Sequence, residues 1–340
     1  MSLEHSIHPL EPFDIEYKSR FEQKDGALQQ LQEDHRVALK AFHEVTSQRE
    51  ARRAVAFQIH VSCMDERDTF ACEATGEPVG AMELFASPGG EITKDRKGES
   101  GAQKLIDLYG KDIAEARAAG KEISISMMPH ICGADGHFGC AAFANDMAAQ
   151  EAYFSELVEA IVARPEFEGV KILTAFYDTD THALKPFHGS ELQADAKESG
   201  IALLERRGGG MADGKGEKDR AHAGNRIYVG DLPRAWIVRR NSAYQLHSGL
   251  DEEALLDGIA LAVKVIQTHS HVNTAAQPIV IQVDRHVGEE FIEILRDPIE
   301  LWNTLKRNSL LKDVEVDEEG IMIVYTETDP KSWEGQLLQK

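Results

Sequence analysis

The sequence predicts an α/β protein: a largely parallel β-sheet flanked by helices, with a second, smaller α/β unit at the C-terminus. Short apolar, β-rich runs alternate with longer segments that carry apolar residues at helical spacing, an order typical of a parallel sheet. A glycine-rich, charged stretch interrupts this alternation after residue 204, and further strands and helices follow it. With 42% hydrophobic and 28% charged residues, the 340-residue chain has a globular composition, enough for one large domain or two ordinary ones.

These patterns divide the chain into four segments. We expect an irregular N-terminal arm over residues 1–26, an α/β domain over 27–204, a flexible linker or loop over 205–224 and a C-terminal α/β unit over 225–340. The linker is expected to be mobile because glycine and charged residues dominate it and no apolar run interrupts them.

The elements of the first domain follow from periodicity. A long amphipathic helix is expected over 26–53, where good helix formers carry apolar residues at helical spacing. The run over 54–62 is almost entirely apolar, as in a strand buried on both faces. The remaining predictions are a strand over 79–87, a loop over 91–101, a helix over 101–120, a strand over 122–128, a loop over 129–140, a helix over 141–163 and a strand over 170–180.

The second unit has the same alternating character on a smaller scale. The stretches 168–180 and 319–329 share a Glu-Gly start, an apolar run and a tyrosine near a final aspartate, so this unit is either a degenerate repeat of the first or similar by chance. Its predicted elements are strands over 226–230 and 234–240, a helix over 251–269, a strand over 278–283, a helix over 289–305 and a strand over 321–327.

Charge and hydropathy restrict the partners and the compartment. The formal net charge of −21 repels nucleic-acid phosphates and anionic lipid, so the sequence predicts neither a nucleic-acid nor a membrane partner. No apolar run approaches the ~20 residues that span a bilayer. The N-terminus is polar and acidic and does not have the apolar segment of a signal peptide, so we expect a cytoplasmic protein with reduced thiols.

The four cysteines are the most informative feature, because all of them fall between residues 63 and 140. Cys63 follows a predicted strand, at the edge where open α/β sheets build their sites. His137 and Cys140 follow another strand with a His-x-x-Cys spacing, so both can converge from one turn leading into a helix. Cys63, His137 and Cys140 form a Cys₂His set, a ligand combination known for catalytic zinc with one open position.

Two alternatives to this ligand set remain open. His130, Cys132, His137 and Cys140 lie within 11 positions and are also suited to a closed structural zinc site, and a third possibility is that these residues bind no metal. Cys72 is interpreted as an ordinary core residue, because no other candidate ligand lies near it in the sequence.

The motifs around the predicted ligands resemble the β-class carbonic anhydrase family. The resemblance consists of Cys63-x-Asp65-x-Arg67 followed downstream by His137-x-x-Cys140, with weaker similarity at Glu83-Leu84-Phe85, at Gly136-His137 and the alanines after Cys140, and over 172–180. It covers roughly residues 27–190. The 74-position gap from Cys63 to His137, the Ser-Pro-Gly-Gly run over 87–90 where the family has an Arg-Asn pair, and the C-terminal unit depart from the family pattern.

The resemblance implies a zinc lyase that hydrates carbon dioxide to bicarbonate through a zinc-bound hydroxide. Zinc lowers the pKa of its bound water to about 7. By resemblance, Asp65 orients this hydroxide, Arg67 pairs with Asp65, and Asp65 becomes the fourth zinc ligand in a resting state. The family completes its site across a dimer interface, so the resemblance also implies a homodimer or, with the C-terminal unit as partner, an internal pseudo-dimer.

Several residues near the site have more than one interpretation. His130 and Asp135 lie on the loop before Cys140 and are candidates for a proton relay, or are simply solvated. Phe85 and Phe138 either wall an apolar pocket or belong to the core. The alternative function is a non-catalytic or repurposed relative, either a zinc-binding scaffold or a hydrolase of a related small molecule such as carbonyl sulfide.

Overall fold

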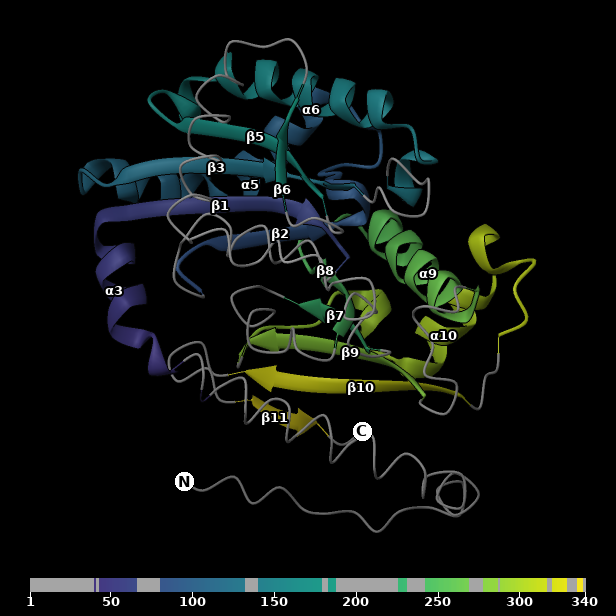
Figure 1. Ribbon diagram of the computed structural model, residues 1–340. Helices are drawn as coiled ribbons and strands as arrows, with labels where there is room; N and C mark the ends of the chain where they lie inside the picture. Colours follow the sequence, from purple (N-terminus) through teal and green to yellow (C-terminus); the bar gives the residue numbers. More distant parts are fainter. Residues whose placement is uncertain are drawn as a thin grey trace, which may run out of the picture.

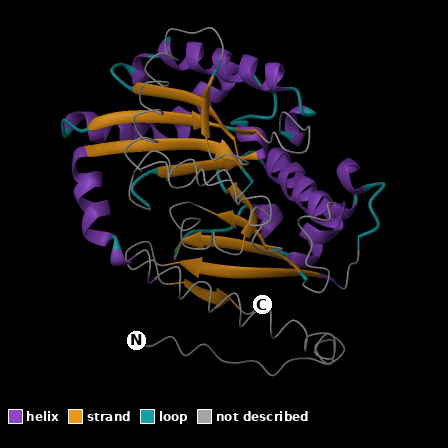
Figure 2. Ribbon diagram, in the orientation of Figure 1, coloured by secondary structure: helices purple, strands orange, loops and turns teal. Residues whose placement is uncertain are grey.

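The fold is described from a computed structural model of the chain. The structure describes residues 40, 43–65, 80–131, 140–178, 183–187, 226–230, 242–268, 278–286, 288–316, 320–328 and 335–338. These residues form two sheets, each accompanied by helices, as Figures 1 and 2 show. The α/β architecture expected from the sequence is therefore confirmed, as is a second unit at the C-terminus.

The first sheet has the strand order β2-β1-β3-β5-β4, with all of these strands parallel, and β6 pairs with β5 in the antiparallel direction. Helix α5 connects β2 to β3 and packs against α6, which connects β4 to β5. The elements of this unit are α3 (Thr46–Val55), β1 (Ala56–Cys63), β2 (Glu83–Ser87), η2 (Pro88–Gly90), α5 (Gly98–Ala118), β3 (Glu122–Met128), β4 (His130–Ile131), η3 (Ala141–Phe143), α6 (Met147–Val162), η4 (Pro165–Phe167), β5 (Lys171–Asp178) and β6 (Ala183–Pro186).

The second sheet has the order β11-β10-β9-β7-β8, with only β11 antiparallel to its neighbour. Its helix α9 connects β8 to β9, and α10 lies between β9 and β10. The elements are β7 (Arg226–Gly230), β8 (Ser242–His247), α9 (Glu252–Thr268), β9 (Ile279–His286), η6 (Glu293–Leu295), α10 (Pro298–Lys306), η7 (Ser309–Leu311), β10 (Ile321–Thr328) and β11 (Gly335–Leu338).

The two sheets share one topology. Strand β1 pairs with β2 and β3 as β7 pairs with β8 and β9, and β5 and β10 occupy the same next position, each with an antiparallel partner. The two stretches that the sequence analysis compared thus supply equivalent strands, as a repeat requires. The arrowheads of β1 and of β9 and β10 point in opposite directions in Figure 1, so the C-terminal strand ends of the two sheets face opposite ways.

The strands of both sheets carry apolar residues toward the helices and polar residues on the other face. In β1, Ile59 and Val61 belong to the main hydrophobic cluster. His60 between them points to the other face, where its Nδ1 forms a hydrogen bond with Oγ of Ser126 in β3 (2.7 Å). Complete burial lowers the pKa of His60 to about 3, so this imidazole is neutral at physiological pH.

The two units meet where the edge strands β2 and β8 come together. The phenyl ring of Phe85 in β2 is fully buried and stacks on the imidazole of His247 in β8, with ring centroids 4.9 Å apart. The hydrophobic cluster is continuous across this junction and contains residues of both units. Phe85 is therefore a core residue at the junction, one of the two interpretations that the sequence left open.

The observed boundaries differ from the expected ones in a few places. Helix α3 continues to Val55, so β1 begins two residues later than expected, and α5 begins at Gly98 inside the expected loop. Strands β4, β6, β8 and β11 were not expected, β4 lies inside the expected loop over 129–140, and α10 begins nine residues after the predicted helix start. The expected helix over 26–53 lies largely outside the described residues, and the expected strand over 234–240 lies wholly outside them. No helix in the described part of the chain is long and apolar enough to cross a bilayer.

We expect Phe85→Ala to lower the free energy of unfolding by about 3–5 kcal/mol, because it removes a fully buried ring from the junction. Lys104→Ala, which breaks the exposed ion pair between Lys104 and Asp251 of the other unit (2.7 Å), should change it by less than about 1 kcal/mol. Urea denaturation measures both values. Equal losses in the two variants would mean that apolar packing does not hold the units together.

Candidate metal centre

Three ligand-type side chains gather at the C-terminal edge of the first sheet: Cys63, His130 and Cys140. One ligand atom from each lies within 4.8 Å of the other two, and all three side chains are buried. The two sulfur atoms are 3.6 Å apart, and both cysteines are free thiols. This is a compact set of two sulfur ligands and one nitrogen ligand brought together from three separate segments.

Cys63 is placed by the end of β1, where its Cα is in register with Ser87 of β2. The backbone of the next residue is held from both sides: the N–H of Met64 donates to the carbonyl of Ser87 (2.7 Å), and the N–H of Gln245 donates to the carbonyl of Met64 (2.7 Å). Asp65 then forms an isolated antiparallel bridge with Tyr244 of β8. The second unit therefore fixes the backbone that leads from the thiol to the carboxylate.

His130 belongs to the short strand β4, which is in register with Tyr177 of β5. The N–H of Tyr177 donates to the carbonyl of Pro129 (3.0 Å), which extends the pairing of β3 and β5 up to the histidine. The Nε2 atom of His130 lies 3.9 Å from a carboxylate oxygen of Asp65, which is itself buried. Asp65 thus stands beside the cluster.

Cys140 directly precedes the 3₁₀ turn η3, and its carbonyl accepts hydrogen bonds from the N–H groups of Phe143 (2.9 Å) and Asn145 (3.0 Å). Ala144 and Asn145 both have positive φ, which closes this turn before Asp146 caps α6 through the N–H of Ala149. The turn holds Cys140 at the entrance to α6.

A second layer supports the turn that carries Cys140. Gly89, with φ of +64°, follows β2, and a Cβ atom there would lie 2.7 Å from the ring of Phe143. The guanidinium of Arg96 lies over the same ring, 4.4 Å from its centroid, and donates to the carbonyl of Ala142 (2.5 Å). Arg96 also pairs with Glu91 (2.5 Å). The residues after β2 therefore hold the turn, and they also contact α6, because Gln150 of that helix donates to the carbonyl of Gly89 (3.3 Å).

Burial decides the electrostatics of Cys63, and a coordinated cation would change them. Burial raises the pKa of the Cys63 thiol well above its usual value, the contact with Cys140 raises it further, and His130 acts in the opposite direction. A dication coordinated by both sulfurs reverses this effect, because it stabilises the thiolates directly. Two sulfur ligands of a tetrahedral zinc ion, each at about 2.3 Å, are roughly 3.8 Å apart, which is close to the observed separation.

The residues predicted from the sequence are brought together in part. Cys63 and Cys140 are in contact and Asp65 is adjacent, as expected for one site. His130, which the sequence analysis named as a relay candidate and as a ligand of the alternative local zinc site, is the imidazole of the cluster among the described residues. His137 and Arg67, together with Cys72, Cys132, Asp135 and Phe138, lie outside the described residues, so their predicted roles stay predictions.

The signal for His130 was present but weak. It lies immediately after the strand that neighbours β1, at the same sheet edge as Cys63. The sequence analysis preferred His137 as the ligand because of its short His-x-x-Cys spacing.

No protein-family model matches the sequence, and no curated protein matches it.

We expect the stability of the protein to fall less steeply with rising pH in Glu91→Gln than in the wild type. Burial raises the pKa of Glu91 to about 7, against the opposing effect of Arg96. The folded state therefore holds this proton more tightly than the unfolded state, whose carboxyl ionises near pH 4.5. The wild type loses stability between about pH 4.5 and 7, and the loss is complete above pH 7.

Unfolding free energies at pH 5 and pH 8 test this expectation. From pH 5 to pH 8, the free energy of unfolding of the wild type should fall by about 1–3 kcal/mol more than that of the variant. Glu99→Gln, at an exposed position in the first turn of α5, serves as control and should show no such shift. If the unfolding free energies of the variant and the wild type differ by the same amount at pH 5 and at pH 8, the raised pKa of Glu91 is contradicted.

Proposed function

We propose that the chain binds one zinc ion through Cys63, His130 and Cys140 and hydrates carbon dioxide to bicarbonate. The observation that carries the proposal is the buried set of two thiols and one imidazole, with a sulfur separation suited to tetrahedral zinc. Thiolate and imidazole ligands favour zinc over magnesium or calcium, and three protein ligands leave one position for water or substrate. The sequence motif around Cys63 and Asp65 supports the same conclusion.

The chemistry requires a strong nucleophile at neutral pH. Zinc supplies it, because water bound to the ion ionises near pH 7. Two thiolates balance the charge of the dication, so the centre as a whole is neutral apart from Asp65. This leaves Asp65 as the charged group that acts on the attacking water.

Asp65 is the candidate catalytic residue. Its carboxylate is buried beside His130, so it is placed to accept a hydrogen bond from the attacking water and to orient a lone pair toward the carbon of the substrate. Addition of water to carbon dioxide forms bicarbonate and releases one proton. By the motif resemblance, Arg67 pairs with Asp65 and keeps it ionised.

The second unit contributes to this centre in cis. The strand β8 holds the backbone of Met64 and Asp65 through Gln245 and Tyr244, so the catalytic carboxylate is positioned by a segment far away in the sequence. The proposal therefore favours the internal pseudo-dimer over a requirement for a second chain.

Zinc content should identify the ligands. We expect Cys63→Ala, Cys140→Ala and His130→Ala each to lower zinc from about one ion per chain to well below half, because each removes one of three protein ligands. His137→Ala is the matched comparison and should keep its zinc. Plasma emission spectroscopy of protein purified without chelators measures the content. Loss of zinc in His137→Ala with retention in His130→Ala would replace His130 by His137 in the ligand set.

Turnover should depend on Asp65. We expect Asp65→Asn to keep zinc and lose about 100-fold or more in kcat for carbon dioxide hydration, because the amide does not accept the hydrogen bond in the same way as the carboxylate. Asp107→Asn, at an exposed position of α5, should behave as the wild type. A stopped-flow assay with a pH indicator measures the rate. Zinc-loaded wild type without hydration above background would refute the catalytic proposal.

One observation favours a structural zinc site as the second candidate function. All three ligand side chains and Asp65 are buried, as in a closed four-ligand site with the carboxylate in the fourth position. In that case Asp65→Asn weakens zinc binding, and the wild type binds zinc without turnover. The two measurements above therefore distinguish the catalytic from the structural role.

A further inference from the structure

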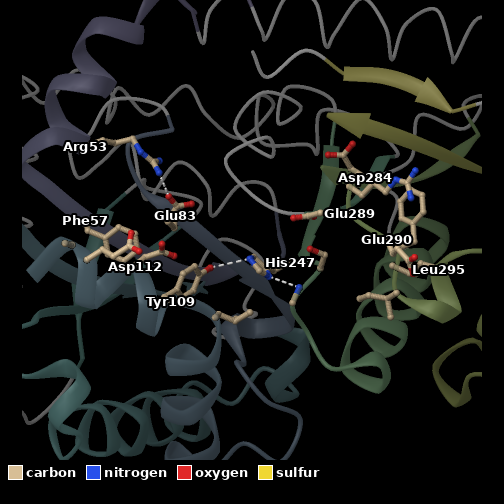
Figure 3. A pocket seen from close by; sticks show the side chains of 18 of the residues that line it. Arg53, Phe57, Glu83, Tyr109, Asp112, His247, Asp284, Glu289, Glu290 and Leu295 are labelled. Atoms are coloured by element: carbon tan, nitrogen blue, oxygen red, sulfur yellow. Dashed lines mark hydrogen bonds and ion pairs between the residues drawn. The ribbon is translucent and has the colours of Figure 1, made fainter. Parts of the chain in front are cut away.

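A cavity of about 750 Å³ lies between the two units, away from the metal centre (Figure 3). One wall comes from the start of β1 and β2 and from α5, and the other comes from the ends of β8 and β9 and the segment that follows β9. Its volume is in the range of small-molecule sites. Neither the three cysteine and histidine ligands nor Asp65 line it.

The cavity occupies the topological position that the metal centre has in the first unit. His247 is the last residue of β8, and Asp284 and Arg285 lie near the end of β9, so the second sheet contributes its C-terminal edge. Ligands of open α/β sheets bind outside this edge. In the first sheet the same edge holds the candidate metal centre. The location thus points to a ligand site independently of the charges of the cavity.

The second unit has no room for a thiolate at the equivalent strand end. β7 ends at Gly230, and a Cβ atom there would lie 2.5 Å from the hydroxyl of Tyr228 and 3.0 Å from Cβ of Asp284. Instead, Asp284 is buried and accepts hydrogen bonds from the hydroxyls of Tyr228 (3.0 Å), Thr326 (2.5 Å) and Thr328 (3.1 Å). A fixed carboxylate on the neighbouring strand β9 therefore lies beside the end of β7 and lines the cavity.

His247 is the second fixed group of the floor. Its Nδ1 accepts a hydrogen bond from the N–H of Gly249 (2.8 Å), so the proton of the neutral ring sits on Nε2, which lies 3.3 Å from the hydroxyl of Tyr109. Figure 3 shows His247 of the second unit in contact with Tyr109, whose helix α5 also carries Asp112. The imidazole and the phenol join the two walls at the bottom of the cavity.

The charges of the cavity favour a cation. Its cationic groups already have partners: Arg53 pairs with Glu83, the ammonium of Lys121 donates to the carbonyl of Arg53 (2.8 Å), and Arg285 pairs with Glu327 (3.0 Å).

Carboxylates outnumber these cationic groups on the two walls of the cavity, and the ion pairs of Glu115 with Lys111 (3.9 Å) and of Glu289 with His286 (3.8 Å) are long. Asp112 and Glu115 are exposed on α5, and Glu289 is exposed on the segment after β9, opposite them. The rings of Phe57 and Phe291 lie among the lining residues and suit the apolar part of an organic cation. A ligand with a single cationic group satisfies one wall only.

We propose that this cavity binds a small organic polycation, a di- or polyamine whose ammonium groups reach the carboxylates of both walls. The aliphatic segments between the ammonium groups lie against the aromatic rings, and the innermost ammonium lies toward Asp284. The site belongs to the junction of the two units and does not depend on the proposed zinc chemistry.

Calorimetric titration of the full-length protein with spermidine at about 50 mM salt tests the proposal. We expect saturable binding at about one site per chain. The double variant Asp112→Asn with Glu289→Gln should weaken it about tenfold or more, because it removes one carboxylate from each wall. The double variant Asp107→Asn with Glu293→Gln makes the same charge change on neighbouring exposed positions outside the cavity and should bind as the wild type.

Three outcomes would overturn the proposal: no saturable binding, equal weakening in both double variants, or binding of citrate that is stronger than that of spermidine. Titrations of zinc-loaded and chelator-treated protein should agree. Such agreement would show that amine binding does not require zinc, so failure of the zinc proposal and failure of the amine proposal can be told apart.

Discussion

The backbone of Met64 is the point on which the rest of the structure depends. Its N–H donates to Ser87 of the first unit and its carbonyl accepts from Gln245 of the second, so this residue joins the two sheets at their edges. Cys63 precedes Met64 and Asp65 follows it. Two short backbone hydrogen bonds thereby fix the positions of a candidate metal ligand and the candidate catalytic carboxylate, and they do so across the junction of the units.

The two sheets share one topology, but their C-terminal edges carry different side chains. In the first unit Cys63 ends β1 and His130 of β4 lies beside this cysteine, with Cys140 brought to them by the turn before α6; burial raises the pKa of the Cys63 thiol. In the second unit a glycine ends the first strand, and a hydroxyl-bonded aspartate takes the space. The second sheet thus keeps the architecture of a site with different chemistry, and its edge faces α5 of the first unit.

The two units pack so closely that separating them is expected to disrupt the C-terminal edges of both sheets. The ring stack of Phe85 on His247 lies at the junction of the units, His247 also lines the cavity, and the hydrophobic cluster runs through both sheets. Surface ion pairs such as that of Lys104 with Asp251 add little in water, whereas buried apolar area is worth several kcal/mol per side chain. The second unit is therefore part of one folded body with the first.

The alternation of apolar runs was sufficient to predict the α/β class, most of the strands and the presence of a second unit, because hydrophobic periodicity is a local property of the chain. Strand-end position and the motif resemblance also grouped Cys63, Asp65 and Cys140 in one predicted site. The imidazole was different: two histidines lie seven positions apart in the sequence, and only the pairing of β4 with β5 brings His130 to the edge where Cys63 ends its strand. The contact of β8 with Asp65 and the cavity at the junction likewise arise from segments far apart in the sequence, so no local pattern encodes them and only the tertiary structure decides them.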